Sequence, residues 1–204
     1  EVILGKSLKE QGIFDIYPEE KKRWYVKVPV FSFNKIRGLD AYLSPEMKST
    51  GEAIGYDDKL NRALFKALQA SGMHLQNYGT VFATIADSDK DEALPLIQRF
   101  YNLGFNIQAT EGTAKFLIEN GIRTHVLQKI SEGSEEIPEA IRQGHIAYII
   151  NTRDISAPDQ ASDGYEIRHL ATENNVTIFT SLDTVRVLLD VLEETTLTIS
   201  TIDS

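Results

Sequence analysis

The stretch Ile146-Ala-Tyr-Ile-Ile-Asn151 contains almost no polar residue before its last position. A short apolar run without alternation is typical of a strand that is covered on both faces. Between Val81 and Glu194, runs of this kind alternate with amphipathic segments, several of which end at a glycine. This alternation predicts an α/β fold, in which a five-stranded parallel sheet carries helices on both faces.

The expected strands are Val81–Ala86, Phe105–Ala109, Thr124–Lys129, Ile146–Asn151 and Val176–Thr180. The expected helices are Lys90–Leu103, Thr113–Glu119, Ile137–Gln143, Tyr165–Asn174 and Leu182–Glu194. These elements place one α/β domain at residues 78–194. The Thr-rich residues 195–204 lack an amphipathic period and are expected to form a loose tail.

Residues 1–77 do not have the pattern of a closed domain. They predict a short helix over Val2–Gly12, a strand over Trp24–Phe33, an irregular stretch over Lys35–Tyr56 and a helix over Asp58–Ser71. One or two strands and a helix bury little core, so we expect the C-terminal tail of a larger domain. The chain starts at Glu1 without a Met, which favours a piece of a longer polypeptide over a trimmed whole protein.

The negative charge of the chain is concentrated in its second part. Residues 1–77 carry 12 basic and 10 acidic side chains, whereas residues 78–204 carry 9 and 20. An acidic domain argues against a nucleic-acid partner, because contacts with the phosphate backbone need a basic surface. A phosphate would therefore be held by a few placed cations and backbone N–H groups.

Several classes of protein are excluded or disfavoured by composition. There is no Cys, which excludes disulfides, thiolate metal sites and cysteine nucleophiles, and which fits a cytoplasmic location. No stretch approaches the roughly 18 apolar residues of a membrane span. The four histidines lack metal-ligand spacing, and neither a catalytic triad nor a P-loop is present. We therefore predict no metal site and no catalytic residues.

Ligands of open α/β sheets bind at the carboxyl ends of the strands, so the residues there are the candidates. Thr110-Glu-Gly-Thr113 places two hydroxyls and a glycine at the start of a helix, where free N–H groups favour an anion. Lys90 and Lys129 follow neighbouring strands and could add positive charge. Together they predict a pocket for a phosphate or carboxylate, although Thr110 alone could be a helix cap.

Other strand ends offer neutral polar groups. Thr84 ends the first strand, and Asn151 and Thr152 follow the fourth, where they suit a sugar or a base. A polar turn is an equally good interpretation of Asn151 and Thr152. Thr180-Ser-Leu-Asp183 is better explained as the cap of the last helix.

Three of these strand ends resemble one family. The runs Ala109-Thr-Glu-Gly-Thr-Ala114, Tyr148-Ile-Ile-Asn-Thr152 and Thr180-Ser-Leu-Asp-Thr184 resemble the regulatory domain of the large subunit of carbamoyl-phosphate synthetase, which shares its fold with methylglyoxal synthase. Upstream, Pro29-Val-Phe-Ser-Phe33 and Pro45-Glu-Met-Lys-Ser-Thr-Gly-Glu52 resemble the end of the second ATP-grasp domain of that subunit. The resemblance covers nearly the whole chain.

The resemblance implies a nucleotide effector such as the inhibitor UMP, with IMP or phosphoribosyl pyrophosphate as alternatives. It places the phosphate end on Lys90, Thr110, Thr113 and Lys129, and nucleotide contacts on Thr84, Asn151 and Thr152. Arg153 stands where some members carry a ligand-contacting Thr. Val28 and Phe179 stand where acidic ligands of ornithine are expected, which favours the pyrimidine-regulated type over activation by ornithine.

The parent enzyme implied by the resemblance makes carbamoyl phosphate from bicarbonate, ATP and glutamine-derived ammonia, for pyrimidine and arginine biosynthesis. It uses ATP with Mg or Mn and a small glutaminase subunit. We expect the fragment alone to lack ligase activity and any cofactor of its own, and self-association is a further expectation.

Two other functions remain open. A methylglyoxal synthase acting on dihydroxyacetone phosphate would need a carboxylate base, a His and a Gly-Gly-Asp loop, and residues 130–138 contain no such loop. A plain interaction module without a ligand is the third possibility.

Overall fold

The structure is a computed structural model, and it describes residues 1–14, 22–32, 41, 47–152 and 160–196, without the side chains of 160–162 and 195–196. Its main body is a parallel sheet with the strand order β5-β4-β3-β6-β7. The strands are β3 (Thr80–Thr84), β4 (Asn106–Thr110), β5 (Thr124–Leu127), β6 (Ile146–Asn151) and β7 (Thr177–Phe179). The predicted five-stranded parallel sheet is confirmed.

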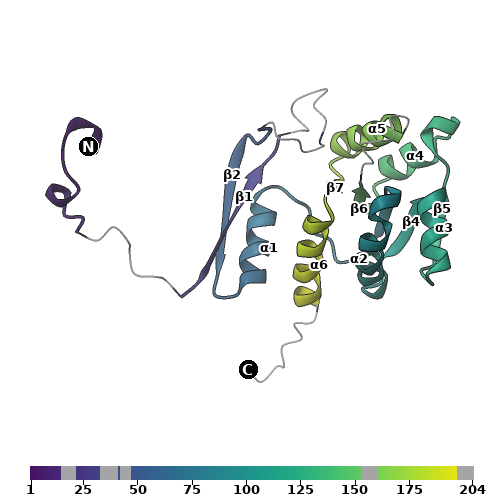
Figure 1. The fold of residues 1–204 in the computed structure, drawn as a ribbon, viewed down its shortest axis with the longest axis horizontal. Coiled ribbons are helices and arrows are strands. Elements are labelled where there is room, and N and C mark those ends of the chain that lie inside the picture. Colours follow the sequence, from purple (N-terminus) through teal and green to yellow (C-terminus); the bar gives the residue numbers. More distant parts are fainter. Residues whose placement is uncertain (15–21, 33–40, 42–46, 153–159, 197–204) are drawn as a thin grey trace, which may run out of the picture.

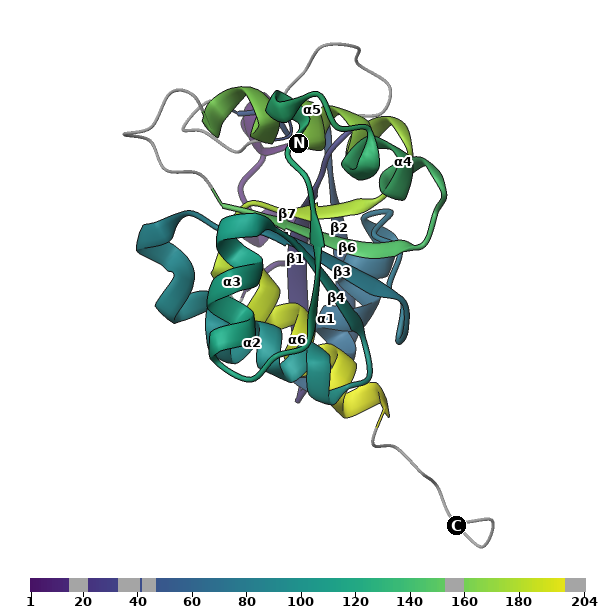
Figure 2. The same cartoon turned by 90° about the vertical axis from the view of Figure 1, so that its right-hand side faces the viewer.

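Helices cover both faces of this sheet, as predicted. One face packs against α2 (Lys90–Asn102), α3 (Glu111–Glu119) and α6 (Leu182–Thr196), and the other against α4 (Glu136–Arg142) and α5 (Gln160–Glu173). Figure 2 shows α4 and α5 above the sheet and the other three helices below it. Among the described residues, no helix has both the length and the apolar character that a bilayer span requires.

Strand β6 lies inside the sheet and is buried at all six positions. Its side chains serve two cores: Ile146 and Ile149 face α4 and α5, whereas Tyr148 and Ile150 face the opposite layer. A register irregularity opposite Thr80 and Val81 lets Ala147 join the layer of Tyr148. The continuous apolar run at 146–150 follows from this burial on both sides.

The boundaries of several helices differ from the predicted ones. Helix α3 begins at Glu111 rather than Thr113, and α5 begins at Gln160 rather than Tyr165. Helix α6 continues to Thr196, so residues 195 and 196 do not belong to the expected loose tail, and residues 197–204 lie outside the described part.

The N-terminal unit is an antiparallel pair of strands, β1 (Trp24–Val30) and β2 (Gly51–Asp57), with α1 (Leu60–Ala70) packed on it. Helix α1 also contacts α6, and it lies between the strand pair and α6 in Figure 1. The predicted strand and helix are present. Residue 33, at the end of the predicted strand, lies outside the described residues, as do residues 34–40 and 42–46.

Two predictions for the N-terminal unit are wrong. The last part of the stretch predicted to be irregular forms β2, whose two glycines weaken the strand signal. The predicted helix over Val2–Gly12 is instead two 3₁₀ turns, Val2–Leu4 and Lys9–Gln11. Each turn ends at a glycine with left-handed backbone, Gly5 and Gly12, and such a residue stops a helix.

Candidate functional site

The carboxyl ends of β3, β4 and β6 border one cleft with a volume of about 240 Å³. The first residues of α2 and α3 also line it, as expected for parallel strands whose carboxyl ends meet at one edge. All seven residues predicted from the sequence lie on its wall: Thr84, Lys90, Thr110, Thr113, Lys129, Asn151 and Thr152. The structure therefore brings the predicted residues together in one place.

Two of the threonines tie the strand ends to one another. The hydroxyl oxygen of Thr113 accepts a hydrogen bond from the N–H of Ile85 at 3.1 Å, and Thr113 is 3% exposed. The hydroxyl oxygen of Thr152 accepts one from the N–H of Ala86 at 2.8 Å. These side chains satisfy backbone donors that follow β3, so they give the wall of the cleft its shape.

Thr110 occupies the cap position before α3, with extended backbone at φ −64° and ψ 154°. Its hydroxyl nevertheless makes no capping hydrogen bond. The interpretation of Thr110 as a side-chain cap is therefore wrong for this structure. Its hydroxyl stays available to a group in the cleft, next to the N-terminus of α3, where unpaired N–H groups favour negative charge.

The charged side chain of Lys90 is held in place by three neighbours. Its Nζ lies 2.6 Å from Oδ1 of Asp87 and donates to the carbonyl of Gly112 at 3.1 Å. The same Nζ lies 5.9 Å from the centre of the Phe116 ring. A Cβ at residue 112 would lie 3.9 Å from Nζ, which is an ordinary contact, so the position of Lys90 does not depend on this glycine.

Lys129 differs from Lys90 in having no partner among the described residues. It follows β5 and is half-buried at the start of the turn Ile130–Glu132. Within the described chain, no hydrogen bond or ion pair involves its side chain. A cation that lines a cleft and is not paired with a carboxylate favours the binding of an anionic ligand.

The sequence analysis missed Arg168 of α5, which is 3% exposed and lines the cleft. Its Nη1 donates to Oδ1 of Asn151 at 2.8 Å, so Asn151 helps to position a buried guanidinium. Gly164 lies one helical turn earlier, and a Cβ there would be 3.1 Å from Nη1. In the sequence, the one indication of such a partner was Asn151, because a polar residue at the end of the buried strand β6 needs a hydrogen-bond partner.

Ser131 and Asp163 were missed as well. The hydroxyl of Ser131 donates to Oδ2 of Asp163 at 2.9 Å, which joins the turn after β5 to the start of α5 along the cleft. The described wall thus contains three cations, Lys90, Lys129 and Arg168, and two carboxylates, Asp87 and Asp163. The described wall therefore has more positive than negative side chains, whereas residues 78–204 as a whole have more negative ones.

The described wall offers cations, hydroxyls and two carboxylates to a ligand. It contains no histidine, and among the described residues no group of three or more His, Asp or Glu could hold a metal ion. Both carboxylates already accept from a neighbour, Lys90 or Ser131.

Comparison with known proteins finds a family that is similar to part of this chain. Residues 92–180, from the first turn of α2 to just after β7, match the family model described as the MGS-like domain. These residues span most of the parallel α/β sheet and the cleft. The match does not reach residues 1–77, whose assignment to an ATP-grasp domain stays a prediction.

A solved structure of similar fold is methylglyoxal synthase from Elizabethkingia anophelis NUHP1. The two chains are 19% identical, the TM-score is 0.46, and the similarity covers 56% of this chain and 79% of that chain.

Proposed function

We propose that this chain is the effector-binding end of the large subunit of a carbamoyl-phosphate synthetase, and that its cleft binds a UMP-type nucleotide. The observation that carries the proposal is the gathering of Lys90, Lys129 and Arg168 at the carboxyl edge of the sheet, inside an acidic domain. Cations held in such a place attract a phosphate group more than a neutral ligand.

The phosphate is proposed to lie between Lys129 and the start of α3. Lys129 has no partner within the described residues, and the Thr110 hydroxyl makes no capping bond. Both can therefore turn to a ligand without breaking an internal interaction. The backbone N–H groups at the N-terminus of α3 add further donors.

The nucleoside part is proposed to lie toward β6 and α5. Asn151 is the last residue of β6 and Thr152 follows it, and Oδ1 of Asn151 accepts a hydrogen bond from Arg168 at 2.8 Å. Thr84 lies at the end of the neighbouring strand β3. Its backbone carbonyl accepts a hydrogen bond from the N–H of Thr152 at 3.1 Å. Pre-positioned polar groups of this kind suit the hydroxyls of a ribose or the edge of a base.

The regulatory role is supported by the chemistry of the wall. Its described residues include three cations and no histidine, which favours the binding of an anion over proton transfer. A bound nucleotide would then act by favouring one of two states of the synthetase through its different affinity for them. ATP, Mg or Mn and the glutaminase subunit belong to the parent enzyme in this proposal.

A methylglyoxal synthase is the second candidate, because the family match is to an MGS-like domain and two carboxylates, Asp87 and Asp163, line the cleft. It makes a distinct prediction, which is the formation of methylglyoxal from dihydroxyacetone phosphate. The two candidates are separated by measuring binding and turnover on the same preparation.

The test is calorimetric titration of the 204-residue chain with UMP, IMP, phosphoribosyl pyrophosphate, ornithine and inorganic phosphate. UMP should bind, and Lys129→Ala should raise its Kd roughly 10-fold to 100-fold, the usual range for loss of a charge-assisted contact. Lys115→Ala is the matched control, because Lys115 is exposed on α3 and does not line the cleft.

Saturable UMP binding that Lys129→Ala weakens and Lys115→Ala leaves intact would support the nucleotide-sensing function. Methylglyoxal formation without UMP binding would replace it with the lyase. The absence of both would leave the interaction module.

A further inference from the structure

A carboxylate of the protein itself already holds one cation of the cleft. Oδ1 of Asp87 lies 2.6 Å from Nζ of Lys90, and both residues line the cleft. The two side chains differ sharply in exposure, at 18% for Lys90 and 84% for Asp87. A phosphate group approaching Lys90 would therefore meet an ammonium that is already paired with an anion.

The partners of Lys90 other than Asp87 keep it in place. The carbonyl of Gly112 accepts from its Nζ at 3.1 Å, and the Phe116 ring lies beneath the charge. Neither contact is anionic, so neither competes with a phosphate for the charge. Lys90 would stay at the wall if Asp87 moved away.

Asp87 is held much less firmly. It begins the 3₁₀ turn Asp87–Asp89, and Lys90 is its side chain's only partner in the described part of the chain. An exposed carboxylate that leaves such a pair regains its hydration, so the cost of releasing it is small. Asp87 can thus exchange its place on Lys90 with an anion from solution.

We propose that Asp87 is an internal competitor that sets the affinity and the selectivity of the cleft for phosphate-bearing ligands. Its carboxylate occupies the Lys90 ammonium, and the phosphate of a bound ligand displaces it into water. A phosphomonoester with nearly two negative charges competes well with this carboxylate, whereas a ligand with a single carboxylate or no charge gains little. This inference rests on the proposed function of the cleft and names Asp87 as a specificity residue within it.

The first test is the affinity of Asp87→Asn for UMP and for inorganic phosphate, measured by calorimetry on the 204-residue chain. The amide keeps the shape of the side chain and removes its charge. We expect the Kd of both probes to fall about threefold to tenfold, since a partly exposed pair of this kind is worth little more. Uridine, which lacks the phosphate, should bind no better, which would place the gain at the charged group of the ligand.

Two controls separate competition at Lys90 from a general change in charge. Asp91→Asn removes a nearby exposed carboxylate of α2 that does not line the cleft. Lys90→Ala, alone and combined with Asp87→Asn, removes the cation for which the two anions compete. The double-mutant cycle measures whether the two positions act on the ligand together.

Tightening by Asp87→Asn that disappears in the Lys90→Ala background supports the inference. An equal gain in affinity in Asp91→Asn, or a gain that persists in the Lys90→Ala background, would overturn the inference. The gain would then come from the lower negative charge of the whole domain. Unchanged or weaker binding by Asp87→Asn, with normal binding by wild type, would overturn this inference alone. If neither wild type nor Asp87→Asn binds either probe, the proposed function falls and this inference falls with it.

Discussion

Arg168 shows how one buried side chain organises the cleft. A guanidinium that is 3% exposed is costly unless its donors are used, and one of them is used by Oδ1 of Asn151 at 2.8 Å. Asn151 is thus held in a single orientation at the end of β6. The pair joins the sheet to α5 at the point where the ribose or base of a ligand is proposed to lie.

Gly164 provides the space for this pair, and filling that space should disturb it. A Cβ at residue 164 would lie 3.1 Å from Nη1 of Arg168 and 3.5 Å from both terminal atoms of Asn151. In Gly164→Ala we expect the guanidinium to shift and the Kd for UMP to rise by about threefold to 30-fold, in line with loss of one charge-assisted hydrogen bond.

The stability of the same variant should change little, because alanine favours a helix over glycine by about 1 kcal/mol and offsets the crowding. Urea unfolding measured beside calorimetry would separate the two effects. Unchanged UMP affinity in a well-folded Gly164→Ala would show that the Arg168–Asn151 pair does not depend on this space.

The site could be predicted from sequence only where a local rule applies. Parallel strands present their carboxyl ends at one edge, so the residues that follow them, such as Thr110 and Asn151, were found by position alone. Arg168 and Asp163 reach the cleft from α5, and a charged residue of an amphipathic helix is normally expected to face solvent. Their place depends on how α5 packs, which no local pattern encodes.

The strands, too, could be predicted only where a local sequence pattern determines them. Continuous apolar runs predicted the central strands β3 and β6, because burial on both faces favours an apolar residue at nearly every position. Strand β2 was missed, since glycine is disfavoured in strands and β2 contains Gly51 and Gly55. Gly55 is present for a tertiary reason, because α1 lies directly against the backbone of the strand there.

Gly55→Ala should separate α1 from the strand pair. A Cβ at residue 55 would collide with the backbone of α1 at the carbonyl oxygen of Ala63 and the nitrogen of Ala67. Helix backbone cannot yield as a flexible side chain can, so we expect a destabilisation of at least 3 kcal/mol in the N-terminal unit. Limited proteolysis should then cut β1, β2 or α1 while the sheet domain persists.

Gly51→Ala in the same strand is the control. A Cβ there would meet only the Cβ of Val30, at 3.8 Å, which is an ordinary contact. Equal protease resistance of Gly55→Ala and Gly51→Ala would contradict the packing described for α1.

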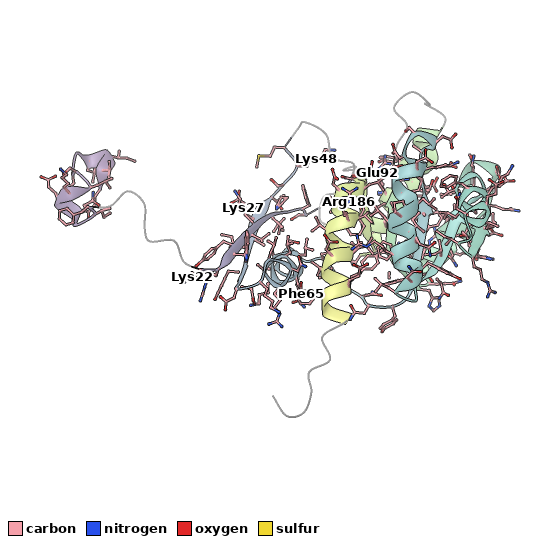
Figure 3. All side chains as sticks on the ribbon, turned by 60° about the horizontal axis from the view of Figure 1, so that its bottom comes forward. Lys22, Lys27, Lys48, Phe65, Glu92 and Arg186 are labelled. Atoms are coloured by element: carbon pink, nitrogen blue, oxygen red, sulfur yellow. The ribbon has the colours of Figure 1, made fainter. Side chains whose placement is uncertain are left out.

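At the scale of the molecule, α6 connects the two units. On one side it contacts α1, and on the other it is joined to α2 by ion pairs. Figure 3 labels one of these pairs, Arg186 of α6 and Glu92 of α2, whose charged atoms lie 3.1 Å apart. The connector before β3 is held as well, because the Tyr148 hydroxyl accepts from the N–H of Gln76 at 2.7 Å and donates to its carbonyl at 2.8 Å.

Arg99 makes the firmest of the links between α2 and α6. Its Nε and Nη2 donate to the two oxygens of Glu193 at 2.8 and 2.7 Å, and Nη2 also donates to Asp190 at 2.6 Å. The hydrogen bonds from Arg99 hold the pKa of Glu193 below its usual value of 4.5, although partial burial opposes this. The Glu193 side chain is 37% exposed, so solvent screening leaves the pair worth less than about 1 kcal/mol.

This pair should give the chain a small, pH-dependent part of its stability. A lowered pKa means that the folded state favours the carboxylate, so the contribution is complete above the unfolded pKa of about 4.5 and is lost as the pH falls through the folded pKa. Glu193→Gln should therefore unfold at lower urea concentration than wild type at pH 7, and at nearly the same concentration near pH 3. Glu139→Gln, at an exposed position of α4, should match wild type at both pH values. A deficit of Glu193→Gln that persists undiminished near pH 3 would mean that some property of the Glu193 side chain other than its charge joins α6 to α2.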